Sequence, residues 1–334
     1  MKPVVIFLCM IVPLKFANAT QNRNSGGQFI LNSVHFSDAK HGWAVGDGGL
    51  VLSTVDGGAT WCSQNSGTTD DLESVTFVDN RHGWTVGFEN GTILYTRDGG
   101  VTWQRSISGG LNGLSSVSFV DSLHGWIVGE HGVILATGDG GLNWHLQSIN
   151  SEPFRSAWLM STHFVDTQHG WASGEALLAT SDGGRTWVDT QAKNVDPTNR
   201  ALVLSMVTNS VYFVDVKHGW IAASSGLILI ATDGGTNWRP QRNSGGDNLN
   251  SVYFKDLKRG WAVGNNGTIL GTTDGGTTWV VQNSRIGPSY GTHIGLGAHL
   301  RSIFCWDNQN CWAVGSAESI LSTTDGGTTW HIQH

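Results

Sequence analysis

A short motif recurs seven times along this chain: Asp-Gly-Gly, any residue, Thr or Asn, and then Trp. Successive copies are separated by 42, 41, 43, 51, 41 and 51 residues. A repeat of about 41 residues with occasional loop insertions matches one four-stranded propeller blade, which buries its apolar faces only against neighbouring blades. The copies centre on Asp56, Asp98, Asp139, Asp182, Asp233, Asp274 and Asp325, and they end at Trp61, Trp103, Trp144, Trp187, Trp238, Trp279 and Trp330.

The first unit shows how one blade is built. Residues 31–36 alternate apolar and polar side chains as a strand does, strand-like segments follow at 42–46 and 50–53, and a fourth strand begins near Thr60. We therefore predict one all-β domain at 20–334, a seven-bladed β-propeller of four-stranded antiparallel blades. The blades are expected at about 28–65, 70–107, 112–148, 157–191, 207–242, 248–283 and 299–334.

The residues of the repeated turn have structural roles. A tight hairpin requires positive φ angles, which glycine adopts without steric cost. The Asp carboxylate can accept backbone hydrogen bonds within the turn, and the Trp can fill the space between sheets. We therefore assign the seven motif Asp residues to structure. A second Asp and a second Trp recur near the first turn of each unit, at Asp38, Asp79, Asp121, Asp166, Asp215, Asp256 and Asp307 and at Trp43, Trp84, Trp126, Trp171, Trp220, Trp261 and Trp312.

The N-terminal residues 1–19 read as a secretory signal peptide. Lys2 precedes an apolar run, and Ala17-Asn18-Ala19 has the small residues of a cleavage site. The apolar run is too short to span a bilayer, and no later segment qualifies. Without this leader 17 basic residues remain against 26 acidic ones, a balance that argues against nucleic-acid binding. We expect an exported, periplasmic or secreted monomer without a transmembrane segment.

Cys9 belongs to the leader, and three cysteines remain in the rest of the chain. Cys305 and Cys311 fall on facing positions of one first hairpin, so we predict a disulfide between them. Cys62 is then expected to be an unpaired, buried thiol. No set of ligands accompanies these cysteines, and we predict no metal and no cofactor.

The ends of the repeat indicate how the ring closes. The last unit contains its own fourth strand, and residues 21–27 resemble the loop that follows the fourth strand of the fifth unit. We therefore expect that no strand is exchanged across the junction of blades 1 and 7.

Three enlarged inter-blade loops carry most residues that the repeat does not explain. In a propeller these loops share one face with the turns between the second and third strands, and loops on a rigid scaffold commonly bind partners. Arginines with nearby aromatic side chains suit protein surfaces and carboxylates. We identify a candidate partner-binding patch on this face; solvated loop charges are the alternative. Its members are Arg155, Trp158, Arg200, Arg285, Tyr290 and Arg301.

The repeat resembles the photosystem II stability/assembly-factor propellers, within the larger group of Asp-box (BNR) repeats. The residues that carry the resemblance are His82-Gly83-Trp84-Thr85-Val86-Gly87, and Trp261 to Gly264 followed by Thr273 to Trp279. The resemblance covers nearly the whole chain after the leader. It implies a non-catalytic protein that holds a membrane-protein subunit during assembly, in the thylakoid lumen if the host is photosynthetic. In any other host we expect a general extracytoplasmic scaffold. The family's arginine-rich patch has no residue-by-residue match in this chain.

A glycan-binding protein or a sialidase-like glycoside hydrolase is the alternative, because these proteins also use Asp boxes. A sialidase would need an Arg-Ile-Pro motif, which is absent, and three arginines converging on the substrate. The aligned central positions offer one arginine and one carboxylate, and Tyr212 and Tyr253 align inside the repeat as core residues. We therefore expect a protein that is not an enzyme. The central positions are Asn32, Glu73, Ser115, Met160, Asn209, Asn250 and Arg301.

Overall fold

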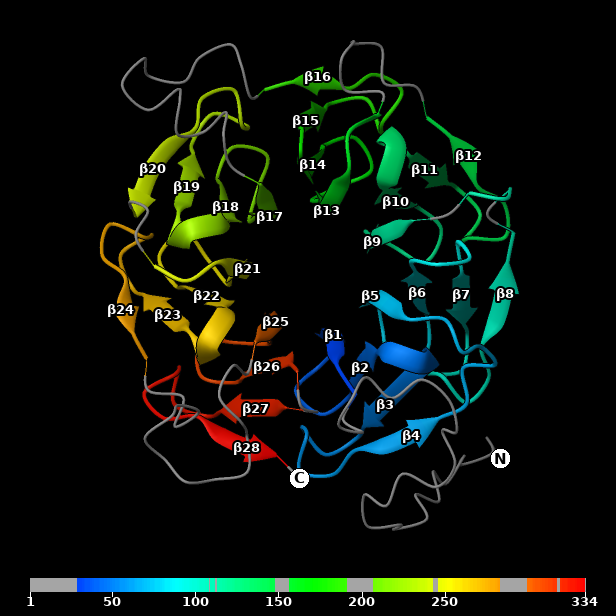
Figure 1. Ribbon diagram of the computed structural model, residues 1–334, viewed down its shortest axis with the longest axis horizontal. Helices are drawn as coiled ribbons and strands as arrows, with labels where there is room; N and C mark the ends of the chain where they lie inside the picture. Colours follow the sequence, from blue (N-terminus) through cyan, green and yellow to red (C-terminus); the bar gives the residue numbers. More distant parts are fainter. Residues whose placement is uncertain are drawn as a thin grey trace, which may run out of the picture.

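The computed structural model contains seven four-stranded sheets arranged as blades around a central axis (Figure 1). It describes residues 29–107, 109–111, 113–147, 156–190, 207–242, 246–282, 299–316 and 319–333. Each sheet is antiparallel, and its strands follow one another in chain order. This arrangement confirms the predicted all-β, seven-bladed propeller.

The strands have similar lengths in every blade. Blades 1 and 2 comprise β1 (Leu31–Phe36), β2 (Gly42–Gly46), β3 (Leu50–Thr54), β4 (Cys62–Gln64), β5 (Leu72–Phe77), β6 (Gly83–Gly87), β7 (Ile93–Thr96) and β8 (Gln104–Ser106). Blades 3 and 4 comprise β9 (Leu114–Phe119), β10 (Gly125–Gly129), β11 (Ile134–Thr137), β12 (His145–Leu146), β13 (Leu159–Phe164), β14 (Gly170–Gly174), β15 (Leu177–Thr180) and β16 (Val188–Asp189).

Blades 5 to 7 follow the same plan. They comprise β17 (Thr208–Phe213), β18 (Gly219–Ala223), β19 (Ile228–Ala231), β20 (Arg239–Arg242), β21 (Leu249–Phe254), β22 (Gly260–Gly264), β23 (Ile269–Thr272), β24 (Val280–Val281), β25 (Leu300–Cys305), β26 (Cys311–Gly315), β27 (Ile320–Thr323) and β28 (His331–Gln333). Four of the turns between second and third strands form single 3-10 turns: η1 (Asp47–Gly49), η2 (Glu130–Gly132), η4 (Ser224–Gly226) and η5 (Asn265–Gly267).

Backbone hydrogen bonds sort the turns onto two faces. On one face the Asp-Gly-Gly turn lies beside the first turn of the same blade, where Gly57 N donates to Lys40 O at 3.0 Å. On the other face the turn between the second and third strands lies beside the inter-blade loop, where Asp47 N donates to Ile30 O at 3.0 Å. We call these the Asp-box face and the loop face.

The motif carboxylate is used inside its own turn. Asp56 accepts hydrogen bonds from Thr60 N at 2.9 Å and from Thr60 Oγ1 at 2.6 Å. Thr54 Oγ1 donates to the same carboxylate at 2.8 Å and accepts from Gly58 N at 2.9 Å. Gly58 has a φ of 88°, which a larger residue would adopt only with strain. The Thr contact recurs in every blade except blade 5, where Ala231 replaces the Thr.

The second recurrent Trp joins each blade to the next. Trp43 stacks on Phe77 with ring centroids 3.5 Å apart, and its Nε1 donates to Gly99 O at 3.0 Å. The Nε1 bond recurs at all seven junctions, including Trp312 to Gly57 across the closure. Blades are therefore held together by buried aromatic packing and by one hydrogen bond at a fixed position.

Serines of the innermost strands form a second set of inter-blade bonds. The amide of Val75 donates to Ser33 Oγ in the preceding blade at 3.2 Å, and six equivalent bonds complete the ring at 3.2–3.3 Å. β1 and β25 lie side by side (Figure 1), and both kinds of inter-blade bond are present at their junction. The expectation that no strand is exchanged across the closure is confirmed, since each blade contains its own four strands.

Two cysteine predictions have different outcomes. Cys305 and Cys311 are paired residues of β25 and β26, and the disulfide between them is present as predicted. The prediction of an unpaired thiol at Cys62 is wrong, because this half-buried residue is disulfide-bonded. The sequence-based prediction excluded Cys9 together with the leader, so it considered no partner for Cys62.

Among the described residues there is no helix long and apolar enough to cross a membrane. The proposed signal peptide at 1–19 lies outside those residues.

Candidate functional site

A cavity of about 610 Å³ opens on the loop face at the end of the central axis. We call this cavity the cup. Its wall is formed by residues of all seven blades and of the loops above them. They are Asn32, Glu73, Phe88, Ser115, Trp158, Met160, Asn209, Asn250, Asn265, His299 and Arg301.

The seven aligned central positions reach the cup because each one is a β-bulge. In β1 the pairing with β2 skips Asn32, since Leu31 pairs with Gly46 and Ser33 pairs with Val45. The same skip occurs in the first strand of every other blade. A bulge leaves one residue out of the ladder and turns its side chain away from the regular alternation. One residue of each blade is thereby directed to the mouth of the axis.

Three of these bulge residues are asparagines whose amide nitrogens hold the next blade. Nδ2 of Asn32, Asn209 and Asn250 donates to the carbonyl oxygens of Leu72, Leu249 and Leu300 at 3.0, 2.8 and 2.8 Å. Because a carbonyl can only accept, these bonds fix the orientation of each amide. Their Oδ1 atoms remain as acceptors.

Glu73 lines the cup, and the carboxylates of Asp47 and Asp71 lie close enough to influence it. Burial raises the pKa of the Glu73 carboxyl to about 7; the positive charge of Arg301 opposes this shift, and the charges of Asp47 and Asp71 add to it. Burial, and next the charge of Asp71, also raises the pKa of Asp47 above its usual range. These carboxylates of blades 1 and 2 therefore lie in a setting that disfavours their ionised forms.

Aromatic side chains form another part of the wall. Trp158 and Phe88 have ring centroids 5.7 Å apart. Trp158 is fixed at both ends, because its Nε1 donates to Ser115 Oγ at 3.0 Å and its backbone N donates to Glu175 Oε2 at 2.9 Å. The Trp158 ring is therefore a fixed surface of the cup.

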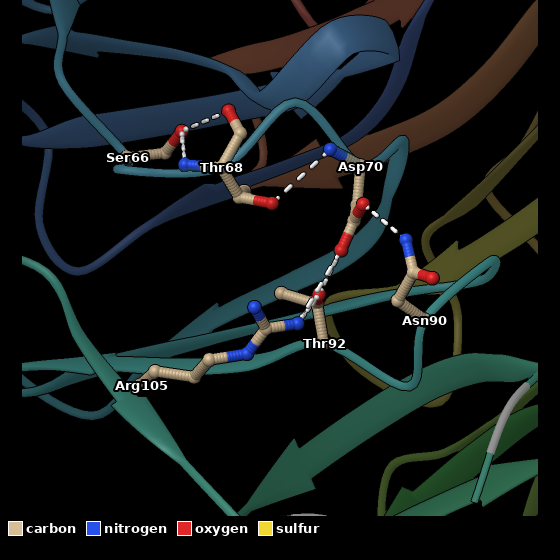
Figure 2. Close-up of polar contacts among 6 residues, drawn as sticks. All are labelled: Ser66, Thr68, Asp70, Asn90, Thr92 and Arg105. Atoms are coloured by element: carbon tan, nitrogen blue, oxygen red, sulfur yellow. Dashed lines mark hydrogen bonds and ion pairs between the residues drawn. The ribbon is translucent and has the colours of Figure 1, made fainter. Parts of the chain in front are cut away.

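The rim of the loop face is tied by a buried carboxylate (Figure 2). Asp70, 8% exposed, accepts hydrogen bonds from Asn90 Nδ2 at 2.5 Å and from Thr92 Oγ1. Arg105 donates to Thr92 Oγ1 at 2.6 Å and lies 3.4 Å from the Asp70 carboxylate. Asp247 holds Asn266 and Thr268 in the same way at 2.8 and 3.1 Å. Both Asn-Gly-Thr turns are thereby fixed to the preceding inter-blade loop.

An arc of aromatic rings lies farther along the innermost strands. His163, Tyr212, Tyr253, Phe304 and His35 follow one another with centroid separations of 4.4, 4.7, 5.1 and 4.6 Å. Burial lowers the pKa of both histidines to about 4 and raises the pKa of both tyrosines. Tyr212 and Tyr253 thus pack with core residues, as the repeat alignment predicts.

The predicted patch is only partly within the described residues. Trp158 and Arg301 both line the cup, whereas Arg155, Arg200, Arg285 and Tyr290 lie outside the described residues. Phe88 is a lining residue that was not predicted from the sequence, because the turn in which it lies carries no repeated motif. Among the described residues no group of three His, Cys, Asp or Glu side chains is placed to hold a metal ion.

A protein-family model described as photosynthesis system II assembly factor YCF48 matches the chain at residues 21–106, 61–145, 111–211, 147–242, 200–280 and 244–334. Among solved structures, the chain is similar to one titled "YCF48 bound to D1 peptide", at 20% identity and a TM-score of 0.68, over 89% of this chain and 92% of that chain. YCF48 from Cyanidioschyzon merolae is 22% identical, with a TM-score of 0.67 and coverage of 89% and 96%.

A GH74 enzyme from Niastella koreensis is also similar, at 14% identity and a TM-score of 0.69, over 91% of this chain and 54% of that one. At these identities the likeness of the solved structures concerns the fold alone. Among curated proteins, none matches the chain.

Proposed function

The chain belongs to the photosynthesis system II assembly factor YCF48 family, and on that premise we propose that it is a non-catalytic protein that binds a protein partner at its loop face. The observation that carries this proposal is the cup, a cavity of about 610 Å³ with a fixed aromatic wall and three asparagines whose amide nitrogens are bonded to backbone carbonyls. A relative of the same fold was solved with a bound D1 peptide, which supports a protein segment as the ligand.

We also propose where the protein is located and which kind of partner it binds. The leader-like residues 1–19 support export to a periplasmic, secreted or, in a photosynthetic host, thylakoid-lumenal location. Family membership supports a membrane-protein subunit under assembly as the partner. We further propose that the chain acts as a monomer and that Arg155, Arg200, Arg285 and Tyr290 extend the binding surface from the cup.

Glycan binding or glycoside hydrolysis is a second candidate, favoured by the aromatic and amide lining of the cup, since such side chains also suit sugars. A two-carboxylate hydrolase needs an acid and a second carboxylate across a cleft. Glu73 is the one carboxylate among the described residues that line the cup. Hydrolysis of an aryl glycoside or a sialoside by the purified protein, lost in Glu73→Gln, would establish this candidate instead.

The proposal is tested by affinity purification of tagged protein from membrane and periplasmic fractions of the native host. Trp158→Ala removes the fixed wall of the cup, and Lys258→Ala changes an exposed residue on the Asp-box face. We expect the Trp158 variant to lose specific protein partners and the Lys258 variant to retain them. Equal recovery of the same partners with both variants would contradict binding at the cup.

A further inference from the structure

We propose that the cup receives a positively charged side chain, the ammonium of a lysine or the guanidinium of an arginine, from the partner protein. This inference rests on the proposed function and specifies the chemistry of the same site. Charge, hydrogen-bonding capacity and an aromatic wall each lead to it.

The hydrogen-bonding capacity that the three bulge asparagines leave in the cup is that of acceptors. The amide nitrogens of Asn32, Asn209 and Asn250 donate to backbone carbonyls, so these three side chains can offer a ligand only their oxygens. Asn32 is 7% exposed, and its buried Oδ1 has no hydrogen-bond partner among the described residues. Trp158 Nε1, a donor, is already used by Ser115. A ligand rich in donors fits such a lining, and an ammonium or guanidinium group carries donors only.

The charges around the cup also favour a positively charged ligand. Three carboxylates, of Asp47, Asp71 and Glu73, interact with one another, and Arg301 is the cation that acts on Glu73 and Asp47. The described part of this cluster is therefore negative in excess. An incoming cation would favour the ionised carboxylates, whereas an incoming carboxylate would add to their repulsion.

The aromatic wall also favours a positively charged ligand. A cation within about 6 Å of an aromatic ring face is attracted by the ring quadrupole. Trp158 is held by hydrogen bonds at both ends and lies beside Phe88, so its position does not depend on the ligand. The aliphatic stem of a lysine or arginine can pack on these rings while its charged end reaches the carboxylates.

The test uses two short blocked peptides, acetyl-Ala-Lys-Ala-amide and the same peptide with norleucine in place of lysine. Binding to the full chain is followed by the indole ¹⁵N–¹H resonances, with Trp158 assigned from its loss in Trp158→Phe. We expect the lysine peptide to shift the Trp158 resonance and to bind at least about tenfold more tightly than the norleucine peptide. Added salt should weaken binding of the lysine peptide more than binding of the norleucine peptide.

Substitutions on the loop face determine which charges matter. Glu73→Gln should weaken binding of the lysine peptide by about tenfold. Glu89→Gln, an equal change of charge at an exposed residue outside the cup, should leave it near the wild-type value. Arg301→Gln should strengthen binding, because it removes the competing cation. Thermal unfolding of each variant shows whether the fold is retained.

Several results would overturn the inference. Equal affinity for the lysine and norleucine peptides would do so, as would weaker binding of the lysine peptide by Arg301→Gln. A neutral oligosaccharide that shifts Trp158 equally in wild type and in Glu73→Gln would assign the cup to glycans. Partners that depend on Trp158 but not on Glu73 would sustain the proposed function and remove this inference, whereas charge-dependent peptide binding without any protein partner would remove the proposed function.

Discussion

The backbone amide of Val34 in blade 1 donates a hydrogen bond to Ser302 Oγ in blade 7 at 3.3 Å. No strand crosses this junction, yet its contact is the one found at the other six junctions. The closure of the ring therefore depends on the same repeated side chains as every junction within the chain. These repeated bonds between blades keep the seven bulge residues at fixed positions around the cup.

Replacing Ser302 with Ala should destabilise the protein by about 1 kcal/mol, because the buried amide of Val34 loses its acceptor. Ser161→Ala removes the same bond between blades 4 and 5 and is the matched comparison. We expect similar losses in the free energy of unfolding, measured in urea. A loss several times greater for Ser302→Ala would show that the closure depends on this bond more than the other junctions do.

Blade 5 offers a gain in stability at Ala231. Six blades have a Thr there that donates to the motif Asp and accepts from the second Gly, and Ala231 provides neither bond. Ala231→Thr should therefore stabilise the protein by roughly 1 kcal/mol, and the reverse change Thr272→Ala should cost a similar amount. Thermal unfolding would measure both; a destabilised Ala231→Thr variant would mean that this buried position cannot accommodate the larger side chain.

Glu73 should make stability depend on pH. Its pKa is raised from 4.5 to about 7, so between these values the folded protein retains a proton that the unfolded chain releases. The free energy of unfolding should therefore fall as the pH rises through this window. Glu73→Gln should remove that slope and be more stable above pH 7 by on the order of 2 kcal/mol. Glu89→Gln should retain the wild-type slope in chemical denaturation across this range.

The Asp-box carboxylates should make the protein sensitive to acid. Hydrogen bonds from Asn143 lower the pKa of Asp139 to about 2, and hydrogen bonds from Thr329 do the same for Asp325. Their contribution is present above the unfolded pKa and is lost as the pH falls toward 2. Asp325→Asn should therefore cost stability at pH 7 and less at pH 2. An equal cost at both pH values would contradict a role for the ionised carboxylate.

The repeat predicts the fold because each recurrent residue serves the same junction in every blade. The Asp-Gly-Gly turn, the two tryptophans and the alternation of the first strand were sufficient to place the blades and the closure. The hydrogen bonds between blades could not be predicted from the sequence. Ser33 and its equivalents read as polar positions of a strand, and only the neighbouring blade reveals that they accept an amide proton.

The cup was predicted in part. Alignment of the repeats identified the seven central positions, including Glu73 and Arg301, but not that each one is a bulge. Burial raises the pKa of Glu73, and the charges of Asp47 and Asp71 add to this shift. Asp47 lies in the turn between β2 and β3, and Asp71 lies in the loop before β5. Such proximity is a property of the closed ring and has no signature in any one repeat.

The most direct test of the account is photocross-linking from within the cup in the native host. p-Benzoylphenylalanine in place of Trp158 would lie in the cup wall, and the same residue in place of Lys258 would lie on the Asp-box face. The account predicts that a specific protein is captured from position 158 and not from position 258. Capture of the same protein from both positions, or from position 258 alone, would contradict partner binding at the cup.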